Sequence, residues 1–120
     1  MLLGWPELLV SQPRAQDDEC ALIMACIAHE GSGRAALEAA GALPHACKIM
    51  ARRADSKATC SILGVFVEQV CAGAHTPSRT RALVDGGMGA LLAAAGRQHG
   101  ISVGTALGRL GVDSEGNVRR

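Results

Sequence analysis

The chain contains very few aromatic residues and no excess of charge. Trp5 and Phe66 are its only aromatic residues, so its core has to consist of Ala, Leu, Val, Ile, Met and Cys. Small and unbranched side chains of this kind let helices approach closely. Twelve basic and eleven acidic residues leave a net charge of +1, so no overall field attracts nucleic acid or anionic lipid. We therefore expect no nucleic-acid partner.

Long apolar runs and paired cysteines are also missing. No apolar stretch approaches the about 18 residues that cross a bilayer, and the first residues lack the basic segment of a secretory signal. The five cysteines contain no Cys-x-x-Cys pair, which argues against a disulfide framework and a structural zinc site. We expect buried reduced thiols, no cofactor, no membrane partner and an intracellular, cytoplasmic protein, with the nucleus or a cytoskeletal complex as alternatives.

A repeated pattern of apolar helical stretches separated by glycine is the main feature that is present. Segments 34–44 and 80–91 both contain Ala-Leu followed four residues later by glycine, and these glycines, Gly41 and Gly87, lie 46 residues apart. Three further apolar stretches end at residues 27–28, 70–71 and 110–111, with separations of 43 and 40. Such periods are typical of helical repeat proteins. The pattern predicts an all-α domain over 1–112, with repeats at roughly 1–31, 32–75 and 76–112, and an irregular tail at 113–120.

Helix boundaries follow from glycine, proline and capping residues. Asp17 and Asp18 are expected to open a helix, because carboxylates complement its dipole, and Gly31 to close it. Asp55 or Ser56 is expected to cap a long helix ending near residue 70, and Thr76-Pro77 to open the next. The other predicted helices span 2–10, 33–40, 43–53, 88–97 and about 101–110.

These residues resemble the armadillo repeat, a three-helix unit with a short first helix, a glycine corner and a third helix that ends in a small residue. The corners are Gly41-Ala42-Leu43 and Gly87-Met88-Gly89, with a weaker version at Gly4-Trp5-Pro6. The ends of the third helices are 25–28, 68–71 and 108–111. The resemblance implies a right-handed superhelical solenoid of about three repeats, whose third helices line a concave groove that binds a protein or peptide partner.

The resemblance also assigns residues to this groove. In the nuclear import adaptors of the family, a tryptophan and an asparagine four residues later hold basic peptides. The matching positions here carry other residues, so recognition of nuclear signals is not expected. The predicted groove residues are Asp18, Leu22, Cys26, Val65, Gln69, Thr105 and Arg109.

Both ends of the predicted solenoid are apolar. A repeat array normally carries a polar cap, because its terminal faces are otherwise bare. The sequence therefore predicts that another chain, or a missing stretch of the same one, covers the ends, with self-association or a larger complex as a consequence. The residues concerned are Leu2, Leu3, Leu8 and Leu9 at one end and Val103, Ala106, Leu107 and Leu110 at the other.

Three motifs have both a chemical and a structural interpretation. Cys26 and His29 share a helical face, as a thiol and its base would, but a core cysteine and a histidine at a helix end explain them equally. The glycine-rich segments 31–34 and 86–89 lack the Lys-Ser/Thr ending of phosphate loops and fit helix corners. A basic patch fits a solvated face or a site for an acidic protein segment. Its residues are Lys48, Arg52, Arg53 and Lys57.

Two functions remain as hypotheses. The first is a non-catalytic protein-protein interaction module that uses the groove of the third helices. The second is a structural subunit or fragment of a larger assembly, held through its apolar ends. An enzyme is not expected, because the sequence shows no convergent set of polar residues.

Overall fold

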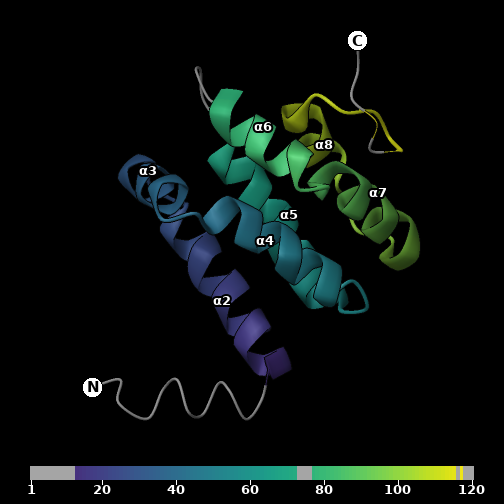
Figure 1. Ribbon diagram of the computed structural model, residues 1–120. Coiled ribbons are helices and arrows are strands. Elements are labelled where there is room, and N and C mark those ends of the chain that lie inside the picture. Colours follow the sequence, from purple (N-terminus) through teal and green to yellow (C-terminus); the bar gives the residue numbers. More distant parts are fainter. Residues whose placement is uncertain (1–12, 73–76, 116, 118–120) are drawn as a thin grey trace.

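The computed structural model describes residues 13–72, 77–115 and 117, and the regular elements of these residues are all helices. This confirms the all-α prediction. The predicted helix at 2–10 and the leucines at the N-terminal end lie outside the described residues. The helices are α2 (Pro13–Ile27), α3 (Gly31–Ala39), α4 (Ala42–Arg52), α5 (Lys57–Val70), α6 (Pro77–Asp85), α7 (Met88–His99) and α8 (Gly104–Leu110) (Figure 1).

Glycine and serine set the starts of the central helices. Gly41 and Gly87 precede α4 and α7 with φ angles of 76° and 86°, in the left-handed region that glycine adopts without a steric penalty. Ser56 caps α5 through its hydroxyl oxygen, which accepts a hydrogen bond from the Thr59 amide at 3.2 Å. Both glycine corners and the serine cap agree with the sequence prediction.

The helix that carries the acidic pair begins earlier than predicted. α2 starts at Pro13, so Asp17 and Asp18 lie in its second turn and do not open it. Proline is tolerated in the first turn of a helix, where its missing amide hydrogen has no intrahelical partner. α2 also ends before Gly31, which instead opens α3. Arg34 closes the corner between them by donating hydrogen bonds to the carbonyl oxygens of Ala28 and His29.

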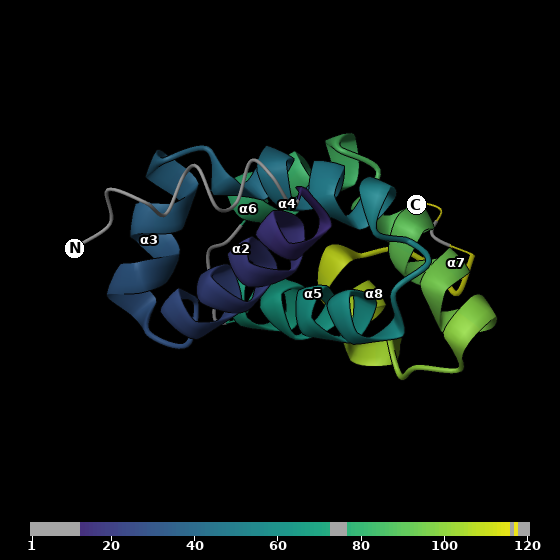
Figure 2. The same cartoon turned by 90° about the horizontal axis from the view of Figure 1, so that it is seen from below.

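The helices form two layers. α5 contacts both α2 and α8, while α4 contacts α6 and α7. Figure 2 shows α4 and α6 on one side of the molecule and α5 and α8 on the other. The molecule measures 47 × 32 × 20 Å, and its least dimension leaves room for two layers, since packed helix axes lie about 8–10 Å apart. The ends of α2, α5 and α8 at Ile27, Val70 and Leu110 reproduce the predicted separations of 43 and 40 residues.

The core lies between these layers and includes most of the cysteines. Phe66, Leu63 and Met88 are fully buried, and Cys47, Cys60 and Cys71 are buried with them. All five cysteines are free thiols. Cys26 is exposed and Cys20 is half-buried, so the prediction of buried thiols is wrong for these two. Both lie on α2, one side of which remains open.

The C-terminal end is covered, in contrast to the prediction. Ala106, Leu107 and Leu110 are at most 6% exposed, and Val103 is half-buried. The short length of α8 lets the chain return after Gly111, and Val112, at 1% exposure, covers the same core. Beyond it, the tail predicted to be irregular forms a turn. The Asp113 carboxylate accepts hydrogen bonds from the amides of Glu115 and Asn117 at 2.9 Å.

Candidate interaction surface

The seven predicted groove residues lie on α2, α5 and α8, and we name the surface that carries them the α2–α5–α8 face. Leu22 and Val65 are its large apolar side chains, and they are 52% and 48% exposed. They occupy matching positions, 43 residues apart, on two helices in extensive contact. The other five residues are exposed or half-buried: Asp18, Cys26, Gln69, Thr105 and Arg109.

Two hollows lie beside α5, and Val65 lines one of them. One, of about 380 Å³, lies between α2 and α5 and is lined by Ala25, Cys26, His29 and Gln69. The other, of about 300 Å³, lies between α5 and the segment before α8. Its lining comprises Lys57, Ser61, Gly64, Val65, Glu68 and residues 100–103. Both are wide and shallow, with more apolar than polar lining, as suits side chains of a protein partner better than an enclosed small molecule.

Gln69 contributes an unusual polar group to the first hollow. Its Oε1 atom is buried and accepts no hydrogen bond from the described residues. A buried acceptor without a donor costs about 1–3 kcal/mol.

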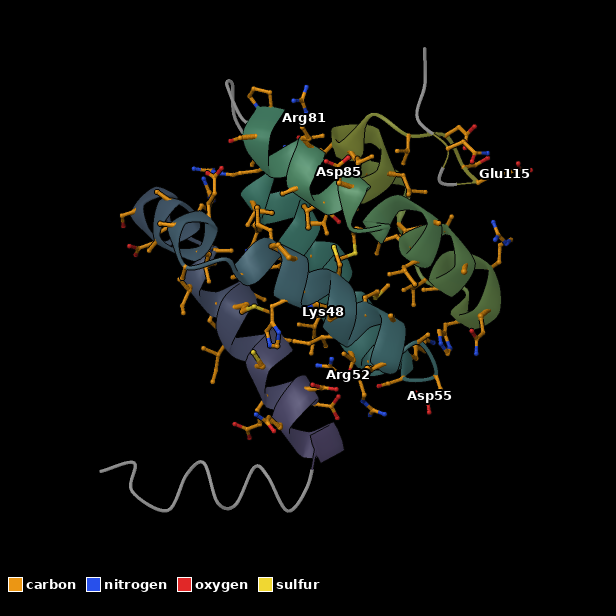
Figure 3. The ribbon with its side chains drawn as sticks, viewed as in Figure 1. Lys48, Arg52, Asp55, Arg81, Asp85 and Glu115 are labelled. Carbon is orange, nitrogen blue, oxygen red and sulfur yellow. The ribbon has the colours of Figure 1, made fainter. Side chains whose placement is uncertain are left out.

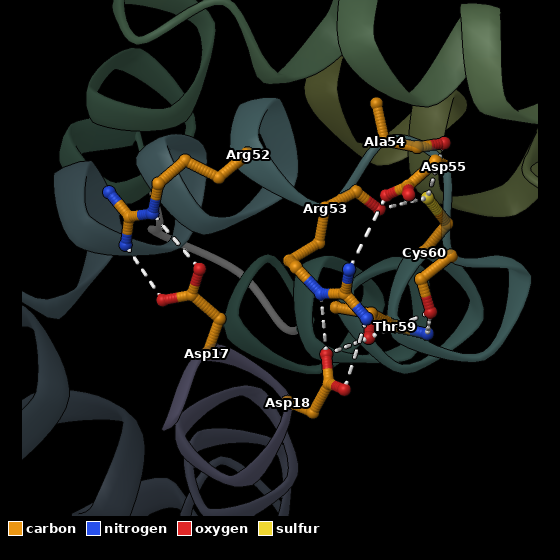
Figure 4. Close-up of polar contacts among 9 residues, drawn as sticks. Asp17, Asp18, Arg52, Arg53, Ala54, Asp55, Thr59 and Cys60 are labelled. Carbon is orange, nitrogen blue, oxygen red and sulfur yellow. Dashed lines mark hydrogen bonds and ion pairs between the residues drawn. The ribbon is translucent and has the colours of Figure 1, made fainter. Parts of the chain in front are cut away.

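Asp18 is committed to the protein itself. Its carboxylate accepts a hydrogen bond from the Thr59 hydroxyl at 2.6 Å and two from the Arg53 guanidinium at 2.9 and 3.2 Å (Figure 4). The Ser56 hydroxyl donates in turn to Thr59 Oγ1 at 3.1 Å. Asp18 therefore joins the start of α5 to α2, and we assign it a structural role at the edge of the face.

The predicted basic patch is divided between the surface and the interior. Arg52 forms a two-pronged ion pair with Asp17 at 2.8 and 3.0 Å, and Arg53 pairs with both Asp18 and Asp55 (Figure 4). The Arg53 side chain is only 10% exposed, so the interpretation as a solvated face is wrong for this residue. Hydrogen bonding to Asp17 raises the pKa of Arg52, and hydrogen bonding to Asp18 raises the pKa of Arg53.

The physical reason for this division is the position of α2 against the end of α4. The acidic pair in the second turn of α2 meets the two arginines across 35 residues of sequence. Lys48 and Lys57 remain exposed, on α4 and at the start of α5. Figure 3 places Lys48 and Arg52 on α4 and Asp55 on the turn that follows it. What is left of the patch is two separate lysines and a neutralised arginine pair.

The thiols offer little nucleophilic chemistry. Burial raises the pKa of Cys20, Cys47, Cys60 and Cys71, which keeps these thiols protonated and unreactive at neutral pH. Cys26 and His29 line the same hollow, but His29 lies beyond the end of α2. Among the described residues, no group of three or more His, Cys, Asp or Glu side chains is placed to hold a metal ion.

The glycine-rich segments serve as helix corners. A Cβ atom added at Gly86 would lie 2.5 Å from the Cys47 sulfur, so this glycine allows α6 to approach α4. Gly87 has the positive φ angle of the corner, and Gly31 to Arg34 open α3. These are packing and chain-reversal roles.

Sequence reasoning missed two features of this region. The first feature is the set of ion pairs. The sequence contains two adjacent acidic residues, Asp17-Asp18, and two adjacent basic residues, Arg52-Arg53, but only the packing of α2 against α4 brings them into contact. The exposed side chains of Ile23 and Ile27 on α2, 45% and 41% accessible, had no sequence signal, because isoleucine in an apolar helix normally predicts burial.

Comparisons with known proteins add no family to this description. No family model matches the chain, and no curated protein and no solved structure matches it. None of the described helices combines the length and the apolar character that a membrane span requires. The fold and the surface together define a small all-helical protein with an open, partly apolar face.

Proposed function

We propose that the chain is a non-catalytic protein-protein interaction module that binds a partner protein or peptide on the α2–α5–α8 face. The observation that carries the proposal is the pair of exposed aliphatic side chains, Leu22 and Val65, at matching positions of adjacent helices. Large apolar groups that remain accessible in neighbouring positions mark interaction sites in soluble proteins. The hollows beside α5 provide space for side chains of the partner.

The proposal includes an armadillo-like superhelix of about three repeats. Support comes from the two left-handed glycines, Gly41 and Gly87, and from the regular ends of α2, α5 and α8. It comes also from links between consecutive units, such as Glu38 of α3 with Arg79 of α6. In such a superhelix, α2, α5 and α8 would be the third helices.

The partner is expected to present apolar groups, because Leu22 and Val65 provide apolar contacts. The pairing of Arg52 and Arg53 with carboxylates weakens the case for nucleic acid or a strongly acidic segment, because these guanidinium groups are already satisfied. Five free thiols fit an intracellular location.

The alternative, a structural subunit held through both apolar ends, has lost part of its basis. Ala106, Leu107 and Leu110 at the C-terminal end are buried by the chain itself. A contact that grips both ends would have to displace part of the core. The α2–α5–α8 face needs no such rearrangement, and we prefer it for this reason.

A site-specific photo-crosslinker tests the proposal in cells that express the chain. We expect a crosslinker at position 65 to give discrete protein adducts, and a crosslinker at position 94, on the exposed surface of α7, to give none. Val65→Asp should lower the yield of a crosslinker at position 22 at least several-fold. The matched variant Ala94→Asp should leave that yield unchanged, with both variants as helical as the parent by circular dichroism. Equal adducts from positions 65 and 94 would refute a role for this face.

A further inference from the structure

One side of α2 carries two exposed isoleucines. The residues at the matching positions of α5 and α8 are buried. Ile23 and Ile27 are 45% and 41% exposed, whereas Phe66 and Val70, 43 residues later, are both 0% exposed. A further 40 residues along, Ala106 and Leu110 are 0% and 3% exposed. We name Ile23 and Ile27 the apolar strip of α2. The comparison indicates that a cover present for α5 and α8 is missing for α2 in the described part of the chain.

The strip adjoins the α2–α5–α8 face at Cys26 and lies away from the buried side of α2. Ala21 is fully buried, and Ile23 lies about 200° around the helix from it, at 100° per residue. On α5, Phe66 lies three residues before Gln69, which lines the hollow between α2 and α5. Residues three apart share a helix face, so Phe66 lies on the side of α5 toward α2. By the same register, the strip lies on the side of α2 away from α5.

We infer that the first ten residues of the same chain cover this strip. The sequence places twelve residues directly before α2, and seven of them are large and apolar: Met1, Leu2, Leu3, Trp5, Leu8, Leu9 and Val10. Its length suffices. Pro13 and Ile27 are about 21 Å apart along α2, whereas twelve extended residues reach about 40 Å. A segment that reaches Ile27 is therefore more extended than the helix predicted for 2–10, which would span only about 14 Å and end near Ile23.

A covalently attached segment is a better occupant than a second molecule for a physical reason. The attachment gives the segment a local concentration in the millimolar range, so a modest apolar contact suffices to hold it. The segment thereby acts as the cap that the first repeat lacks, and it leaves the α2–α5–α8 face open. The inference does not depend on the proposed function, because it rests on the exposure of Ile23 and Ile27 and not on that of Leu22 or Val65.

Trp5 is a built-in probe of this contact. It is the only tryptophan of a chain without tyrosine, and it lies in the middle of the proposed cap. In the full chain, we expect a blue-shifted emission and protection from acrylamide, both independent of protein concentration. Ile23→Asp should shift the emission to the red and raise the quenching constant severalfold. Leu22→Asp places the same charge about 100° around the same helix, on the α2–α5–α8 face and at 52% exposure, and should change neither.

Four results would overturn the inference. Trp5 emission already typical of water in the parent chain would mean that the cap does not dock. Burial of Trp5 that appears only at high concentration, together with a doubled mass by light scattering, would assign the strip to a second copy. Equal effects of Ile23→Asp and Leu22→Asp would place the cap elsewhere. The cap would also lie elsewhere if the Ile23→Asp variant kept its helicity and its Trp5 remained protected from acrylamide.

Discussion

At the scale of single residues, glycines of this chain have different physical roles that composition does not separate. Gly41 and Gly87 adopt positive φ angles, which other residues reach only with strain. Gly33 lies in α3, where an added Cβ would collide with the carbonyl oxygen of Ile27. Gly108 lies in α8, and a Cβ there would meet no atom within 4 Å. The same substitution at Gly33 and Gly108 should therefore have opposite effects.

We predict that Gly108→Ala stabilises the protein by up to about 1 kcal/mol, because alanine loses less conformational entropy in a helix. Gly33→Ala should destabilise it by more than about 1 kcal/mol, since the Ile27 carbonyl belongs to the backbone of the α2–α3 corner and cannot move aside. Urea denaturation followed by circular dichroism measures both variants. Equal midpoints for the two would show that the approach of α3 to Ile27 is looser than described.

Neighbouring residues of one type also differ in their surroundings. The Arg52 side chain is 50% exposed, and its pair with Asp17 adds little stability because water screens it. The Arg53 side chain is 10% exposed and pairs with two carboxylates. Removing one partner of such a group leaves a poorly solvated charge, which costs more than the pair contributes. Two adjacent arginines in the sequence give no indication of this difference.

At the scale of secondary-structure elements, polar side chains fix helices that are distant in sequence to one another. Glu38 of α3 accepts a hydrogen bond from the Ser78 hydroxyl at 2.6 Å and one from the Arg79 guanidinium at 3.0 Å, both on α6. The hydrogen bond from Ser78 and then the one from Arg79 lower the pKa of Glu38 below its ordinary value of 4.5. The link between α3 and α6 therefore depends on pH.

The sign of this dependence follows from the direction of the pKa shift. A carboxyl whose pKa is lower in the folded protein contributes stability that is complete above about pH 4.5, the value for the unfolded chain, and is lost as the pH falls through the folded-state pKa. Glu38→Gln removes the titrating group. We predict that this variant loses less of its melting temperature than the parent between pH 5 and about pH 3.

Thermal melts followed by circular dichroism across this pH range test the prediction. Glu30→Gln is the matched control, because Glu30 is exposed and lies before α3. The control should follow the pH dependence of the parent. If Glu38→Gln also follows it, the contact with α6 does not persist in solution.

At the scale of the whole molecule, α5 is one of the central helices of the core. It contacts α2, α4, α7 and α8. Phe66 lies at 0% exposure in this helix and is the largest of the fully buried side chains, whereas the preceding residue, Val65, is 48% exposed. Adjacent positions of one helix thus belong to the core and to the proposed interaction surface.

We predict that Phe66→Ala destabilises the protein by about 3–5 kcal/mol, because it removes buried contacts and leaves a cavity. For a chain of this size, such a loss is comparable to the total stability of a small domain, and helicity should fall at 25 °C. Val65→Ala should change the stability by less than about 1 kcal/mol. Urea titrations of both variants measure these changes in the free energy of unfolding. A small loss in Phe66→Ala would mean that the layers pack independently of α5.

The parts of the fold that could be predicted from the sequence are those set by residues close together in the chain. Helix ends at Ile27, Val70 and Leu110 and corners at Gly41 and Gly87 follow from residues close in sequence, because capping and φ preferences act within a few residues. The start of α2 was missed, since Asp17 and Asp18 suit a helix start and an ion pair equally. The exposure of Leu22 and Val65 was accessible only through the assumed repeat register.

The sequence by itself determined that the chain is helical, where most of its helices end and where it turns. The tertiary structure alone decided which side chains are satisfied and which are exposed. It paired Asp17 and Asp18 with Arg52 and Arg53, buried Leu107 and Leu110, and left Ile23 open. The reason is physical. Backbone conformation responds to neighbours in sequence, whereas burial and charge pairing depend on which helices meet, and that depends on contacts across the whole chain.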